Sequence, residues 1–386
     1  MLRYLTSGES HGPGLTAIID GLPAGLSLLP SDINRDLARR QIGYGRGKRM
    51  EIEQDEAEIT SGVRLGKTLG TPITLVVKNR DWINWQDKMS VEPFEEIAVK
   101  PLTNPRPGHA DLSGALKYDL KDIRNVLERA SARETTTRVA VGSVCRKFLA
   151  QFNITVFSYV IEIGGIRAKI ERLSPHNLYR KAERSMLRCP CPEAEKQMIK
   201  LIDKARAGGD SLGGIFEIAV EGTPPGLGSY SQWDERLDGR LSRALMSIQA
   251  IKGVEIGIGF NAARLPGSRV HDQIYYKNTT GFYRKTNHAG GIEGGISNGE
   301  PIILRAAMKP IATLYSPLSS VDIFTKKTVK ATVERSDICR VPSAAVIGEA
   351  MVCNEIAAAF LEKFGGDSMK EISRNYNGYL KQLKAF

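Results

Sequence analysis

The 386-residue sequence contains little cysteine and histidine and no long hydrophobic run. Its five cysteines are an odd number, and the only close pair, Cys189 and Cys191, lacks the spacing of a Cys-x-x-Cys motif. No histidine stands at metal-ligand spacing from them, so we expect a reduced, cytoplasmic protein without disulfides or a bound metal. The longest apolar runs, such as 73–77, are far shorter than the ~18 residues of a membrane span, which argues against a signal peptide or a transmembrane helix.

Positive charge is in excess: 54 Lys and Arg against 43 Asp and Glu give a formal net charge of +11. Such an excess could serve nucleic acid, a membrane surface or small anionic ligands. The basic residues are dispersed, however, and the densest cluster, at 39–49, is embedded among glycines. We therefore favour a pocket for a small phosphate or carboxylate ligand, with nucleic-acid binding as the competing class and no membrane partner.

The pattern of apolar residues predicts an α+β fold with a single domain over 1–386, because neither a repeat nor a low-complexity linker divides the chain. Clusters of β-branched and apolar residues predict strands at 15–20, 72–78, 154–163, 215–220 and 301–308. Helical periodicity predicts helices that begin at Ser31 and that cover 131–152, 193–207, 234–251 and 344–364. The polar, aperiodic segment 267–290 is predicted to be a functional loop near the active site.

Two of the five histidines stand in glycine-containing turns that suit a ligand site. His11 lies in Gly-Glu-Ser-His-Gly at 8–12, and His109 lies in Arg-Pro-Gly-His-Ala-Asp at 106–111. Histidine is the side chain whose unperturbed pKa suits proton transfer near neutrality, although a solvated loop histidine is the alternative for both. His176 and His271 lie in polar loop sequence and are assigned no role, and His288 is a weaker candidate.

Other motifs suit an anion or a flat ligand. Ser131 and Glu134 have capping-box spacing, and a helix N-terminus flanked by Arg129 and Arg133 would attract an anion, unless this is an ordinary cap with surface arginines. The basic loop at 39–49 could close over a phosphate or be solvated. The glycine-dense segment 291–299 could be flexible or lie against a flat ligand, since glycine permits close backbone approach. Asp337 could be a base or a structural partner of Arg335.

Taken together, these segments resemble the chorismate synthase family over essentially the entire chain. Three signatures carry the resemblance in the expected order: 8–12 continuing through 19–23, then 128–135, then 335–337 followed by Pro342 and 349–351. The segments 106–111 and 294–299 match further family blocks. The resemblance implies a β-α-β sandwich, in which two sheets enclose helices in one large domain, and a homotetramer.

The resemblance also implies the activity. The family is a lyase of the shikimate pathway that converts 5-enolpyruvylshikimate 3-phosphate to chorismate and phosphate by a 1,4-anti elimination, and it uses reduced FMN although there is no net redox change. By position, the FMN contacts would be Arg129, Ala130, Ser131, Gln249, Ala250, Gly294, Lys309, Pro310, Ile311, Ala312, Thr313 and Arg335. No segment resembles an appended flavin reductase, so we expect a monofunctional enzyme.

Roles for single side chains follow from the same resemblance. His11 should donate a proton to the departing phosphate, and His109 should stabilise the reduced flavin anion at its N1–C2=O edge. Asp337 should assist flavin N5 as the base, with Ser10 in support. Arg40 and Arg46 match basic positions associated with NADP(H) that face the substrate, and together with Arg133 and Arg129 they would clamp its anionic groups.

Overall fold

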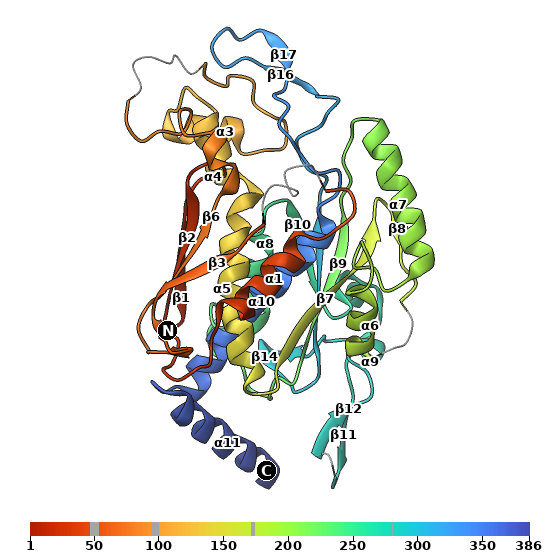
Figure 1. The fold of residues 1–386 in the computed structure, drawn as a ribbon. Helices are drawn as coiled ribbons and strands as arrows, with labels where there is room; N and C mark the ends of the chain where they lie inside the picture. The colour runs from red at the N-terminus through yellow and green to blue at the C-terminus, as the bar shows by residue number, and fades with distance from the viewer. Residues whose placement is uncertain (47–53, 94–99, 171–173, 280) are drawn as a thin grey trace.

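The computed structural model describes residues 1–46, 54–93, 100–170, 174–279 and 281–386. Two antiparallel sheets face one another across a layer of helices (Figure 1). This arrangement confirms the predicted α+β sandwich in a single large domain. The end of the basic loop, 47–49, lies outside the described residues.

The smaller sheet has four strands in the order β1-β2-β6-β3, all antiparallel. Its strands are β1 (Arg3–Ser7), β2 (Gly14–Asp20), β6 (Ile73–Lys78) and β3 (Ala57–Ser61). Alternate residues of β2 and β6 are buried, including Leu15, Ile19 and Val77, because one face of the sheet covers the helices while the other meets solvent.

The larger sheet has five strands in the order β10-β15-β9-β7-β8. They are β10 (Ile251–Ile256), β15 (Ile302–Met308), β9 (Gly214–Glu221), β7 (Thr155–Ile163) and β8 (Ile166–Arg167). Strands β7 and β9 are buried over most of their length, which explains their nearly continuous apolar sequence. Ile218 and Val220 point into the helical layer and join the main core.

Three helices fill the space between the sheets: α1 (Pro30–Gln41), α5 (Thr135–Ala150) and α10 (Val341–Phe364). Helix α10 is long and apolar enough to cross a membrane by length and composition, but most of its residues are buried on every side, as in the core helix of a folded domain. It packs closely against α5, where a side chain at Gly142 would collide with Ala350. Glycine at this position is therefore required by the close approach of the two helices.

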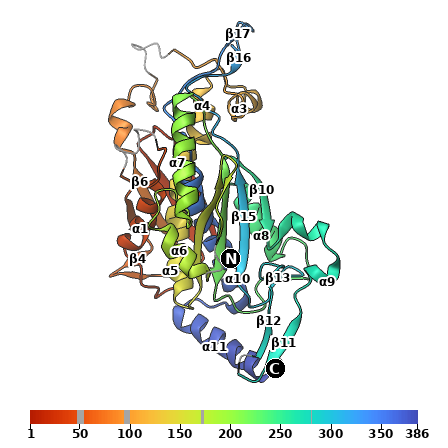
Figure 2. The ribbon, with the colours of Figure 1, turned by 90° about the vertical axis from the view of Figure 1, so that its right-hand side faces the viewer.

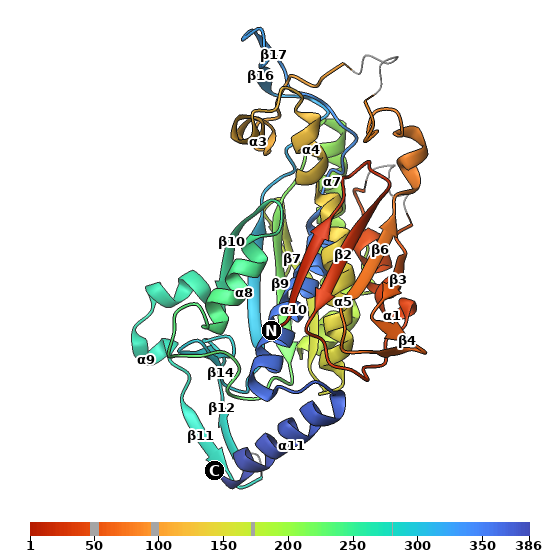
Figure 3. The ribbon, with the colours of Figure 1, turned by 90° about the vertical axis from the view of Figure 1, so that its left-hand side faces the viewer.

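The remaining elements surround this sandwich. They are α3 (Asp111–Tyr118), α4 (Arg124–Ala130), α6 (Pro175–Ala182), α7 (Pro192–Ala207), α8 (Leu237–Met246), α9 (Gly267–Val270) and α11 (Met369–Ala385), the short helices η1 (Arg80–Asn84), η2 (Ala132–Glu134) and η3 (Gly259–Arg264), and the hairpins β4 (Val63–Arg64)/β5 (Lys67–Thr68), β11 (Ile274–Lys277)/β12 (Gly281–Arg284), β13 (Ile292–Glu293)/β14 (Ile296–Ser297) and β16 (Ser319–Val321)/β17 (Thr328–Lys330). Figures 2 and 3 place α3, α4 and β16–β17 at one end of the sandwich and β11–β12 with α11 at the other.

Three local expectations need correction. The segment 267–290 is not an irregular loop, because it contains α9 and the β11–β12 hairpin. The helix expected over 234–251 is shortened to α8, because Ile251 already pairs with Met308 in the larger sheet. The capping box is also absent: Ser131 Oγ accepts from the backbone N–H of Arg133 and begins η2, while the Glu134 side chain bonds to other groups.

Candidate active site

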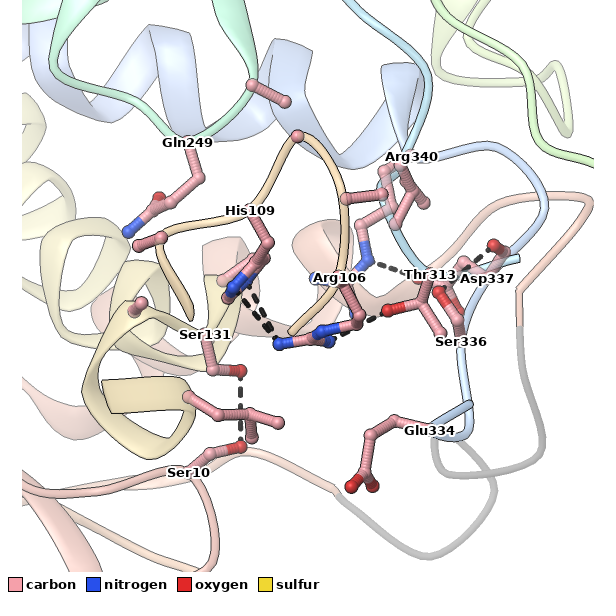
Figure 4. Close-up of a pocket in the computed structure, with 18 of the residues that line it drawn as sticks. Ser10, Arg106, His109, Ser131, Gln249, Thr313, Glu334, Ser336, Asp337 and Arg340 are labelled. Atoms are coloured by element: carbon pink, nitrogen blue, oxygen red, sulfur yellow. Dashed lines mark hydrogen bonds and ion pairs between the residues drawn. The ribbon is translucent and has the colours of Figure 1, made fainter. Parts of the chain in front are cut away.

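A pocket of about 320 Å³ opens at the end of the sandwich that carries α3 and α4 (Figure 4). Its walls come from the turn after β1, from the start of α3, from the α4–η2 junction, and from the segments that follow α8, β15 and β17. Four cationic side chains line it, namely Arg106, Lys309, Arg335 and Arg340, against the two carboxylates Glu334 and Asp337. The pocket therefore carries an excess of positive charge and suits an anionic ligand.

His11 lies in this pocket with its ring almost fully enclosed. Its Nδ1 is 2.9 and 3.0 Å from the two oxygens of Glu128, and its backbone N–H donates to Glu128 Oε2 at 2.7 Å. The ring stacks on Trp85 with 3.9 Å between centroids. Burial raises the pKa of Glu128, but the hydrogen bonds from His11 and the charge of Arg124 outweigh it and lower that pKa below its usual value.

His109 lies across the pocket and has a similar carboxylate partner. Its Nδ1 is 2.6 Å from Asp111 Oδ1, while the guanidinium of Arg106 donates to both oxygens of Asp111. Burial would raise the pKa of Asp111, but the hydrogen bonds from His109 and Arg106 lower it far below its usual value. Arg106 also donates to Thr313 Oγ1 at 2.8 Å, so this turn is tied to the segment after β15 (Figure 4).

Asp337 is buried on the opposite wall and its charge is balanced by two arginines. Its Oδ2 is 2.6 Å from Arg340 Nε and 3.6 Å from Arg46 Nε. Arg335, in contrast, pairs with Asp81 at 3.4 Å. Of the two alternatives left open by the sequence, the pairing of Asp337 with Arg335 is therefore wrong.

Arg40 and Arg133 lie behind the pocket wall, both nearly fully buried around Asp55. Arg40 also donates to Thr135 Oγ1 and to the carbonyl of Ala132, a residue that lines the pocket. Burial and the neighbouring arginines lower the pKa of Arg40 to about 9, although Asp55 opposes them. The charged form of Arg40 is therefore disfavoured in the protein alone, and a bound anion would stabilise it.

The rest of the pocket fits a flat ring. Five alanines, at 110, 130, 132, 250 and 312, line it and leave room beside the backbone. Ala250 has a φ of +69°, a conformation that non-glycine residues rarely adopt and that is frequent at functional sites. Gln249 donates to Glu134, and its Oε1 is buried without a hydrogen-bond partner among the described residues. A ligand with a ring N–H would match such an acceptor.

The structure brings most of the predicted site residues together. The pocket is lined by the four proposed catalytic residues, Ser10, His11, His109 and Asp337, and by the proposed cofactor residues Ala130, Ser131, Gln249, Ala250, Lys309, Ile311, Ala312, Thr313 and Arg335. Ser10 and Ser131 are joined by a hydrogen bond of 3.2 Å between their hydroxyl groups (Figure 4).

Other predicted residues lie outside the pocket lining. Arg129 donates to the carbonyls of Thr6 and Gly8 and so fixes the end of β1, and Pro310 is absent from the lining. Gly294 lies in the β13–β14 turn, where its carbonyl accepts from Arg236. No described residue of 267–290 lines the pocket, so in this chain that segment does not adjoin it.

Several residues of the site were not singled out from the sequence, among them Trp85, Glu128, Glu334, Arg340 and, as a partner of His109, Asp111. Asp111 could have been identified as a partner of His109 from the sequence, because it stands two residues after His109 in a rigid turn. Trp85 could not be identified from the sequence, and Glu128 appeared there only as the first residue of the segment 128–135, because their contacts with His11 form only in the folded chain. Among the described residues there is no group of three His, Cys, Asp or Glu side chains that could hold a metal ion.

Comparisons with known proteins agree with this geometry. The family model described as chorismate synthase matches residues 2–361. The chorismate synthases of Geobacter metallireducens and Geobacter sulfurreducens are each 60% identical over 393 residues, with full coverage of both chains. A solved structure titled as a crystal structure of chorismate synthase has 46% identity and a TM-score of 0.81, covering 100% of this chain and 99% of that one. With the signature motifs gathered around one pocket and matches along its whole length, the chain belongs to the chorismate synthase family.

Proposed function

We propose that this protein catalyses the 1,4-anti elimination of phosphate from 5-enolpyruvylshikimate 3-phosphate to give chorismate, as a lyase of the shikimate pathway that requires reduced FMN. The observation that carries the proposal is the convergence of His11 and His109, from two separate motifs, on one cationic pocket. Membership of the family supports the identity of the substrate.

The charges of the pocket support a substrate with one phosphate and two carboxylates. Arg106, Arg335, Arg340 and Lys309 line the cavity, and guanidinium groups form strong paired hydrogen bonds with such anions. Behind the wall, Arg40, Arg46 and Arg133 add further positive potential. We assign these three residues to the clamp on the anionic substrate, or on the phosphates of NADP(H) if that ligand binds.

The residues present fit a flavin. The flavin would be held by Ala130, Ser131, Gln249, Ala250, Lys309, Ile311, Ala312, Thr313 and Arg335, with the buried Gln249 Oε1 available to accept from a ring N–H. When bound, reduced FMN supplies transient electron donation that weakens the C–O bond to the leaving phosphate. Arg129, Pro310 and Gly294 would contribute to this site only indirectly or from another subunit.

The side chains of the protein would then move the protons. His11 would donate a proton to the departing phosphate, and Ser10 would support it from the neighbouring position. His109 would stabilise negative charge on the ring system that it faces. Asp337 would accept the proton lost from the substrate, and it lines the pocket beside Arg340 and Arg46.

The proposal also covers the oligomeric state of the protein and its cellular compartment. We propose a homotetramer in the cytoplasm that acts on a small molecule and has no nucleic-acid or membrane partner. The reduced flavin would come from a separate source, so the protein would be monofunctional.

Anaerobic phosphate release, measured with chemically reduced FMN and the substrate, tests the function. We expect turnover by the wild type and a loss of about 10²- to 10⁴-fold in His11→Ala and His109→Ala, the usual contribution of a positioned proton donor or acceptor. His176→Ala is the matched control, because His176 is exposed on α6 outside the pocket lining. No phosphate release by the wild type, or wild-type rates in both pocket variants, would refute the proposal.

A further inference from the structure

The two pocket histidines share one local arrangement, although they come from unrelated elements. Each has Nδ1 within hydrogen-bond distance of a buried carboxylate: Glu128 for His11 and Asp111 for His109. Each carboxylate is also bound by an arginine, Arg124 at 3.1 Å from Glu128 and Arg106 at 2.8 Å from Asp111. The side chains of Glu128 and Asp111 are only 1% exposed, so they cannot contact a substrate themselves.

The chemistry of these contacts assigns the ring proton. An ionised carboxylate can only accept hydrogen bonds, and the paired arginines favour the ionised form of both groups. A distance of 2.6 Å between His109 Nδ1 and Asp111 therefore requires a proton on Nδ1. The same reasoning holds for His11, whose Nδ1 is within 3.0 Å of both oxygens of Glu128. In the neutral ring, Nε2 then carries the lone pair.

Further contacts fix the planes of the rings. The ring of His11 stacks on Trp85, and Trp85 is itself held by a hydrogen bond of 3.2 Å from its Nε1 to Asp81. Arg106 Nη2 lies 3.0 and 3.4 Å from the two ring nitrogens of His109, so it spans that ring while it binds Asp111. The ring of His11 is thus held by a carboxylate and by Trp85, and the ring of His109 by a carboxylate and by Arg106.

We propose that Glu128 and Asp111 are positioning residues that hold His11 and His109 in the Nδ1–H tautomer, so that Nε2 carries the lone pair of each neutral ring. The carboxylate behind each ring also stabilises the imidazolium form that a proton donor must adopt. The kinetic consequence of this inference rests on the proposed function. The tautomer, in contrast, is a property of the protein alone.

The test is the 15N NMR spectrum of the imidazole rings in histidine-labelled protein without flavin or substrate. His11→Asn and His109→Asn variants identify the two signals. In the wild type we expect both pocket histidines in the Nδ1–H form, and the exposed His176 as the internal reference with the solution preference for Nε2–H. An Nε2–H tautomer for His11 and His109 in the wild type would overturn the proposal without any further variant.

Glu128→Met and Asp111→Ala then remove the two carboxylates one at a time. We expect Glu128→Met to abolish the Nδ1–H preference of His11 only, and Asp111→Ala that of His109 only, so each variant is the control for the other. Glu362→Gln, which breaks a carboxylate–arginine pair outside the pocket lining, should change neither signal. An unchanged tautomer in both folded variants would overturn the proposal.

Phosphate release with reduced FMN adds the kinetic readout. We expect each variant to lose about 10- to 100-fold in kcat, the size of effect known for groups that orient metal-bound histidines. Altered tautomers with wild-type kcat would show that the pairs do not serve the reaction and would overturn the positioning role. If the wild type shows the expected tautomers but releases no phosphate, the proposed function fails while the assignment of the ring protons stands.

Discussion

Two clusters of buried arginines in this protein are balanced by negative charge to different degrees. The core cluster joins α1, α5, α10 and the segment after α6, and consists of Arg39, Arg146, Arg188, Asp36, Glu183 and Glu349. Its three arginines face three carboxylates. Glu349 lies at the centre, fully buried, with guanidinium nitrogens of all three arginines at 2.6–3.0 Å.

The pocket-side cluster lies in and behind one wall of the pocket and consists of Arg40, Arg46, Arg133, Arg340, Asp55 and Asp337, of which Arg340 and Asp337 line the cavity. Here four arginines face two carboxylates. Two of the ion pairs are also longer, at 3.4 Å for Arg40 with Asp55 and 3.6 Å for Arg46 with Asp337. Among the described residues, this cluster therefore has two fewer carboxylates than arginines, whereas the core cluster has equal numbers.

The shifts in pKa also differ between the core cluster and the pocket-side cluster. The three arginines hold the pKa of Glu349 far below its usual value, although its burial acts in the opposite direction. In the pocket-side cluster burial dominates and lowers the pKa of Arg40 and Arg46. Removing one partner from a fully paired buried cluster is strongly destabilising, whereas buried arginines beside a pocket are preorganised to bind an anion at some cost to stability.

Removing the charge of Glu349, at the centre of the core cluster, should have the largest effect on the free energy of unfolding. Glu349→Gln leaves three buried arginines with two carboxylates, and breaking such a network costs about 3–5 kcal/mol of the free energy of unfolding. Urea denaturation measures this. The control is Glu362→Gln, which breaks the half-exposed pair with Arg240 and should cost ~1 kcal/mol or less. Equal losses in the two variants would show that the core cluster is not a special source of stability.

The pH dependence of unfolding should reveal the same carboxylate. Because the pKa of Glu349 is lower in the folded chain than its ordinary value of 4.5, its contribution is fully present above pH 4.5 and is lost as the pH falls through the folded value. The difference in unfolding free energy between wild type and Glu349→Gln should therefore be constant near neutrality and should shrink below pH 4.5. A difference that persists unchanged at acidic pH would contradict the ionised state of Glu349.

Much of the sandwich could be predicted from the sequence, because its central elements have strong local patterns. The apolar face of α5 and the β-branched runs of β6 and β7 are set by neighbouring residues, and the structure places all three where they were expected. The end of α8 could not be predicted in this way. It is decided by the pairing of Ile251 with Met308 in the larger sheet, a contact between distant parts of the chain.

In the candidate site, too, contacts between distant parts of the chain could not be predicted from the sequence. His11 and His109 stand out because rare histidines occur in rigid turns. Glu128, which orients His11, does not, since it is 117 positions from His11 and its contact with the ring forms only in the folded chain. A sequence motif thus identifies the groups that face a ligand better than the buried groups that hold them, because the latter are defined only by packing.

A substitution in the pocket-side cluster should have a smaller effect on stability and a clear effect on the binding of phosphate. Arg40→Met removes a buried charge that burial and the neighbouring arginines disfavour, so it should destabilise the protein much less than Glu349→Gln while weakening the affinity for inorganic phosphate by about tenfold, or ~1.4 kcal/mol. Phosphate affinity can be followed by the rise in Tm with phosphate concentration. Arg35→Met is the matched control: it removes the same charge from the same helix, but Arg35 has a side chain that is 63% exposed and lies outside the pocket lining. If both variants weakened phosphate binding equally, net charge rather than the buried cluster would govern anion binding, and the contrast between the two clusters would fail.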